Sequence, residues 1–138
     1  MLLISVEAHI QSPLSSVWSA WTQAEHVQHW NFASPDWHCP SASNDLRIGG
    51  EFHYTMAAKD GSMEFDFWGT YKQIISEKQI DIVIGDGRHM FVYFESTPDG
   101  TLVREEFEPE KMNPEDMQQM GWQLILNNFK SYAEGLAE

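Results

Sequence analysis

Glu105 is the residue in this sequence best placed for acid–base chemistry. It shares a face of a predicted strand with Phe107, and His53 and His89 lie on neighbouring predicted strands. A carboxylate that points into an apolar cavity has a raised pKa and could serve as an acid or a base. However, no serine or cysteine nucleophile has an evident base, no paired-acid signature is present, and His53 alternates away from Phe52. We therefore predict no catalytic residue.

A second group of residues has the nitrogen and sulfur donors that zinc prefers. His26, His29, His38 and Cys39 lie within fourteen residues of one another. Their spacing matches no common structural zinc finger, and the adjacent pair His38 and Cys39 could join one tetrahedral ion only with strain. We predict that the chain binds no metal, and no motif indicates a cofactor.

A third motif is Asp45-Leu46-Arg47 followed by Gly49-Gly50. A phosphate-binding loop would need its glycines to open a helix, whereas strand signals follow these glycines. We interpret the glycines as a tight bend and Arg47 as a structural ion-pair partner.

The elements that must position these residues follow one another in a distinctive order. Leu2–Ile10 alternates as a half-buried strand, and two short helices follow it, the second opened by a capping box of Thr22 and Glu25. Residues 31–44 hold two prolines and several small polar residues, which predicts a loop. From Asp45 onward the alternating pattern predicts an antiparallel meander. Its strands are separated by three glycine turns, Lys59-Asp60-Gly61, Gly85-Asp86-Gly87 and Pro98-Asp99-Gly100.

A long helix is predicted from Asn113 to Leu136, with Asn113 as its cap and Pro114 in its first turn. Its predicted apolar face comprises Met117, Met120, Gly121, Leu124, Ile125, Asn128, Phe129 and Tyr132. A glycine inside a helix costs up to ~1 kcal/mol against alanine. We therefore expect Gly121 to mark a close approach of the backbone or a ligand. Only the sheet can cover this face, so we predict one α+β domain over residues 1–138.

The chain also resembles the START-like, helix-grip superfamily, often called SRPBCC. Within it, the chain resembles the family named for the C-terminal domain of the activator of the heat-shock-protein-90 ATPase. The motifs that carry this resemblance are Pro13–Thr22, Asp45–Phe52, Asp60-Gly61, Phe67–Tyr71, Gly121-Trp122 and Ile125-Leu126. The resemblance implies a curved sheet of about six to seven strands wrapped on the terminal helix, with two short helices after the first strand. It also implies a cavity between sheet and helix in many members.

The sequence is rich in aromatic residues, with six tryptophans, eight phenylalanines and four tyrosines. Some of them could line such a cavity. We predict binding of a small apolar molecule, lipid-like or aromatic, by Trp30, Phe32, Trp37, Tyr54, Phe67, Tyr71, Glu105 and Trp122. Two alternatives stay open. One is a co-chaperone-like domain that docks on a chaperone through the sheet or the acidic run, although we expect no additional N-terminal domain. The other is a cyclase- or hydrolase-type enzyme that uses Glu105.

Composition excludes several partners. The net charge of −13 opposes attraction to nucleic acid or to an anionic membrane surface. No run approaches the ~20 apolar residues of a membrane helix. A single cysteine, Cys39, excludes an internal disulfide, and the first residues lack signal-peptide features, so we expect a cytoplasmic protein.

Overall fold

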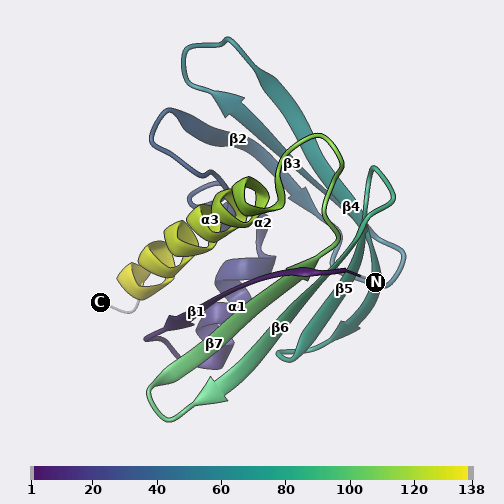
Figure 1. The fold of residues 1–138 in the computed structure, drawn as a ribbon. Coiled ribbons are helices and arrows are strands. Elements are labelled where there is room, and N and C mark those ends of the chain that lie inside the picture. The colour runs from purple at the N-terminus through teal and green to yellow at the C-terminus, as the bar shows by residue number, and fades with distance from the viewer. Residues whose placement is uncertain (1, 137–138) are drawn as a thin grey trace.

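The computed structural model describes residues 2–136, which form seven strands and three helices. In chain order these are β1 (Ile4–Ile10), α1 (Leu14–Thr22), α2 (Ala24–Val27), β2 (Trp37–Asn44), β3 (Glu51–Ala58), β4 (Glu64–Ile75), β5 (Gln79–Ile84), β6 (His89–Thr97), β7 (Gly100–Phe107) and α3 (Glu115–Leu136). The strands form one antiparallel sheet in the order β1-β7-β6-β5-β4-β3-β2. The sheet curls around α3 (Figure 1). The predicted α+β fold, with a curved sheet wrapped on a long terminal helix, is confirmed.

The core lies between the concave face of the sheet and the helices. Alternate residues of each strand point to this face because the side-chain period of a strand is two. On β5, β6 and β7 the buried residues are Ile80, Ile82, Ile84, Met90, Val92, Phe94, Thr101, Val103, Glu105 and Phe107. Helix α3 contributes Leu126 and Phe129, both fully buried. From α1, Trp18 and Trp21 meet the Phe94 ring edge-on, with ring centroids 5.1 and 5.9 Å apart.

The segment predicted as a loop, residues 31–44, contains the edge strand β2. This strand pairs with β3, and its register shifts between His38 and Ser41, on either side of Pro40. Proline has no N–H to donate, so a sheet accepts it on an edge strand or at a bulge. The loop prediction was wrong for residues 37–44, because prolines and small polar residues also suit an irregular edge strand.

Two helix starts differ from their predictions. The capping box does not form, because the Thr22 hydroxyl donates to the Trp18 carbonyl at 2.8 Å within α1. In α3 the Pro114 carbonyl accepts the first helical hydrogen bond, from the Gln118 amide at 3.1 Å. Within residues 2–136 the Asn113 side chain makes no capping hydrogen bond, so Pro114 marks the boundary instead.

Helix α3 packs on the sheet with a face that only partly matches the predicted one. Phe129 is buried, and Ile125 and Tyr132 pack against the core, as predicted. Met117, Met120 and Leu124 were expected to be buried but are 59, 64 and 43% exposed, while Gln118 is buried. Around Gly121, no atom of residues 2–136 outside its own helical turn lies within 4 Å of the position a Cβ would take. The expected close approach of the backbone at Gly121 was therefore wrong.

None of the helices within residues 2–136 combines the length and the hydrophobicity that a membrane-spanning helix needs.

Candidate functional site

A cavity of about 260 Å³ lies between α3 and the concave face of the sheet. Its walls come from α1, the segment after α2, strands β3 to β7 and α3. The lining residues are Trp21, Trp30, Asn31, Phe52, Tyr54, Met56, Phe65, Phe67, Tyr71, Ile80, Ile82, Arg88, Met90, Glu105, Trp122 and Ile125. Phe65 is 46% exposed, which places it at the open end of the cavity.

Most of the residues predicted to bind a ligand lie on the wall of this cavity. Those that line it are Trp30, Tyr54, Phe67, Tyr71, Glu105 and Trp122. Phe32 and Trp37 do not line it. Phe32 packs against the buried core, and the Trp37 ring lies 6.0 Å from the ring of Phe65 on the edge-strand side. Both come from the segment whose strand β2 the sequence did not reveal, so their side-chain directions could not be assigned from a pattern.

Aromatic contacts hold the two main walls together. The Trp122 ring of α3 stacks on the Phe107 ring of β7 at 3.8 Å with an 11° interplanar angle. It also meets Phe67 of β4 edge-on at 6.2 Å. On the opposite wall, the Phe52 ring lies 4.7 Å from Tyr54 and 5.5 Å from Phe67. Such aromatic pairs stabilise the packing of the walls more than the burial of their surface alone would. The walls therefore have a defined shape.

Ten lining residues were not among those predicted to bind a ligand. Eight are apolar, namely Trp21, Phe52, Met56, Phe65, Ile80, Ile82, Met90 and Ile125. Strand alternation had already placed several of these on inward faces, so that signal could have found them. Asn31 and Arg88 are the polar additions, and no motif or periodicity marked either one.

Glu105 is buried, with 5% of its surface exposed, and lines the cavity. On β7 it lies opposite Val6 of β1 and Val92 of β6, so its strand neighbours are apolar. Among residues 2–136 its carboxyl group makes no hydrogen bond, and burial raises its pKa to about 8. The side chain is therefore mainly a neutral acid at pH 7, with an O–H that can donate a hydrogen bond.

Asn31 supplies the second unpartnered polar group of the cavity. The residue is only 5% exposed, and its Nδ2 has no hydrogen-bond partner among residues 2–136. Its amide lies near the Cys39 thiol and lowers that group's pKa, but burial is the largest effect and raises the pKa. Cys39 thus stays a thiol, which is a poor acceptor, and we regard Asn31 Nδ2 as unsatisfied.

Two tyrosine hydroxyls complete the polar part of the lining. The Tyr71 hydroxyl donates to Asn44 Oδ1 at 2.6 Å, and Asn44 Nδ2 donates to the Thr22 carbonyl. Burial raises the pKa of Tyr71 to about 12 and raises that of Tyr54 well above its ordinary value. Both hydroxyls are therefore neutral in the physiological range.

The potential zinc ligands make other contacts, and His26 and His29 both contact Tyr132. His26 Nδ1 lies 2.6 Å from the Tyr132 hydroxyl, and the His29 ring stacks on Tyr132 at 5.4 Å. Cys39 is buried on β2. Among residues 2–136, no three His, Cys, Asp or Glu side chains are arranged to hold a metal ion.

The remaining candidates lie at the surface, and His89 is exposed at the start of β6. Arg47 Nε pairs with Asp45 Oδ2 at 2.9 Å in an exposed ion pair beside the glycine bend. His53 lies on the outer face of β3, where it stacks on Trp68 and bonds to Asp66 and Glu51. None of them reaches the cavity.

A curled antiparallel sheet that wraps a long C-terminal helix, with an internal cavity between them, defines a START-like, helix-grip domain. Within this class, the chain belongs to the family described as Activator of Hsp90 ATPase homolog 1-like protein, which matches residues 11–134.

Solved structures agree with this assignment. The solution structure of the AHSA1-like protein from Aeromonas hydrophila has a TM-score of 0.93 and 44% identity, covering 99% of this chain and 94% of that one. A protein from Cytophaga hutchinsonii has a TM-score of 0.82 and 48% identity, covering 97% and 93% of the two chains. Protein NE0264 from Nitrosomonas europaea shares the fold alone, with a TM-score of 0.84, 18% identity and coverage of 99% and 96%. No curated protein matched the chain.

Proposed function

We propose that this protein binds a small, mostly apolar molecule in the cavity between α3 and the sheet. The observation that supports this most directly is the cavity itself, about 260 Å³ with mainly aromatic and aliphatic walls. Protein interiors are close-packed, and voids larger than a water molecule are few. A mostly apolar cavity with a few polar groups is the usual form of a ligand site.

The volume limits the size of the ligand. An apolar cavity of about 150 Å³ accommodates benzene, and drug-sized ligands occupy roughly 300–1,000 Å³. A cavity of about 260 Å³ therefore suits a one- or two-ring aromatic molecule or a short acyl chain. A sterol would be too large unless part of it remained outside. Binding at micromolar strength corresponds to about 8 kcal/mol.

Acid catalysis at Glu105 is the second candidate function. The specific observation in its favour is the raised pKa of a carboxyl group that lines the cavity. However, the lining residues described for this cavity include no serine, histidine, cysteine or lysine that could act as nucleophile or base. Binding is therefore the better supported proposal.

The proposed binding can be tested by filling the cavity. Ile125 lines it, while its neighbour Leu124 is 43% exposed on the other side of α3. Ile125→Trp should abolish binding of a neutral two-ring probe such as 2-acetylnaphthalene, measured by equilibrium dialysis, whereas Leu124→Trp should bind it like the wild type. Mass spectrometry of the recovered probe would reveal any chemical turnover. Failure of the wild type to bind naphthalene derivatives or medium-chain acyl compounds would contradict the proposal.

A further inference from the structure

Two polar groups in the cavity lack hydrogen-bond partners. Asn31 Nδ2 is fully buried and has no hydrogen-bond partner within residues 2–136. The Glu105 carboxyl group lines the same cavity, belongs to a residue that is only 5% exposed, and owes its raised pKa to burial, with no hydrogen bond contributing. A buried polar group without a partner is unfavourable by roughly 1–3 kcal/mol, so native proteins rarely leave one without a role. Here the two come from different walls, one from β7 and the other from the segment after α2.

Both groups have a proton to donate. Asn31 Nδ2 is a donor only, because it belongs to the amide NH₂ group. Glu105 is surrounded by apolar neighbours and carries its proton at neutral pH, so its O–H is also a donor. A ligand that satisfies both donors must therefore have a hydrogen-bond acceptor. A carbonyl oxygen suits this role because its two lone pairs can each accept a hydrogen bond.

A ligand carboxylate does not suit this arrangement. Arg88 is the cationic side chain of the described lining, and it is already engaged, with Nε 2.8 Å from Asp86 Oδ2 and Nη1 3.1 Å from the Glu108 carbonyl. The other titratable lining groups, Tyr54 and Tyr71, are neutral hydroxyls. A buried anion beside the acid Glu105 would find no free counter-charge, and the protein's net charge of −13 opposes its entry.

We infer that the cavity selects small apolar molecules carrying a neutral carbonyl oxygen, such as an aryl ketone, aldehyde or ester, and that Glu105 and Asn31 donate hydrogen bonds to that oxygen. This inference rests on the binding function proposed above and adds the chemical class of the ligand. The aromatic walls hold the hydrocarbon part, and the two donors set its orientation.

The test compares three ligands of nearly the same shape. 2-Acetylnaphthalene has the neutral carbonyl, 2-isopropylnaphthalene replaces it by an apolar branch, and 2-naphthoate replaces it by a charged carboxylate. Dissociation constants from equilibrium dialysis at pH 6.5 should rank the ketone at least tenfold tighter than the hydrocarbon, since one satisfied buried donor is worth about that factor. The naphthoate should bind more weakly than the ketone.

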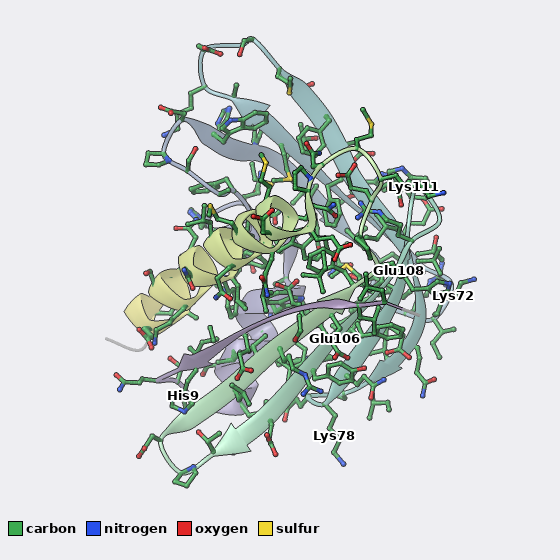
Figure 2. The ribbon with its side chains drawn as sticks, in the orientation of Figure 1. His9, Lys72, Lys78, Glu106, Glu108 and Lys111 are labelled. Atoms are coloured by element: carbon green, nitrogen blue, oxygen red, sulfur yellow. The ribbon has the colours of Figure 1, made fainter. Side chains whose placement is uncertain are left out.

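Variants then assign the preference to the two donors. Glu105→Leu and Asn31→Leu should each reduce the ketone-to-hydrocarbon ratio about tenfold. The matched control is Glu106→Leu. Glu106, labelled in Figure 2, is the next residue of β7, and strand alternation turns its side chain to the opposite face of the sheet from buried Glu105. This control should leave the ratio unchanged. Thermal melts establish that each variant is folded.

A second measurement needs no variant. The carbonyl stretching frequency of bound 2-acetylnaphthalene should be lower than in an apolar solvent, because hydrogen bonds to the oxygen weaken the C=O bond. An unshifted frequency, a hydrocarbon that binds as tightly as the ketone, or a naphthoate that binds tightest would each overturn this inference and leave the binding function standing. Absence of binding by all three compounds would overturn both.

Discussion

Gln123 Nε2 donates a hydrogen bond to the main-chain carbonyl of Glu7 at 3.1 Å, so helix α3 covers the free edge of strand β1. Gln119 Nε2 donates a hydrogen bond to the Ser5 carbonyl at 3.0 Å, and Lys130 Nζ donates one to the His9 carbonyl at 2.7 Å. The spacing of the two glutamines matches that of their acceptors, because four helical residues advance about 6 Å and two strand residues about 6.8 Å. These contacts block a sheet edge that would otherwise be open to another chain.

The first prediction follows from this edge. Replacing both glutamines, Gln119→Met and Gln123→Met, keeps side-chain length and helix propensity but removes two donors to β1. We expect the free energy of unfolding to fall by about 1–2 kcal/mol, since a neutral hydrogen bond contributes roughly 0.5–1.5 kcal/mol. Urea unfolding monitored by circular dichroism measures this. The control is Gln73→Met, because Gln73 is exposed on β4, away from the edge strand β1. Equal effects in the two proteins would contradict the assigned role of the edge contacts.

The second prediction contrasts two glycines. A Cβ at Gly69 would stand 2.8 Å from Ile82 Cγ2, 2.8 Å from Phe52 Cε2 and 2.9 Å from the Val83 carbonyl oxygen. Gly69→Ala should therefore overpack the core and destabilise the fold by about 1–3 kcal/mol. Gly121→Ala has open space and should stabilise the fold by about 0.5–1 kcal/mol through helix propensity. Melting temperatures that move in the same direction for both variants would contradict this contrast.

The third prediction concerns pH. The pKa of Glu105 is raised by burial from 4.5 to about 8, so the native state binds its proton more tightly than the unfolded state. The contribution of the Glu105 proton to the free energy of unfolding is therefore complete below about pH 4.5, and it is lost as the pH rises to about 8. The loss is at most about 5 kcal/mol, and water that enters the cavity would reduce it. Urea unfolding between pH 5 and 8 should show this decline in the wild type and a shallower one in Glu105→Gln.

His53 needs a separate control in that experiment. Hydrogen bonds from its ring to Asp66 and Glu51 raise its pKa, so it also contributes stability that is lost as pH rises. The His53 side chain is 42% exposed, and solvent screening makes its effect small. We therefore expect His53→Gln to leave most of the decline in place. If His53→Gln removed the decline and Glu105→Gln did not, the assignment to Glu105 would be wrong.

The sequence by itself determined the fold class and most of the concave face. Alternation along β5 and β7 assigns Ile80, Ile82, Val103 and Glu105 to one side, because adjacent residues of a strand must point to opposite faces. The motifs from Pro13 onward already indicated the family. These are local or family-wide signals, and no knowledge of distant contacts is needed to use them.

Tertiary structure decided the phase of α3, the strand β2 and the polar groups of the cavity. The helix offers apolar residues over a wide arc, and Met117 and Leu124 are exposed because Gln119 and Gln123 must face β1. Strand β2 forms because it pairs with β3. The local sequence of a proline-containing segment does not indicate such a pairing. Asn31 and Glu105 line the same cavity although more than seventy residues separate them in the chain. Burial and hydrogen bonding of this kind depend on which distant segments meet, and that is fixed only when the chain packs as a whole.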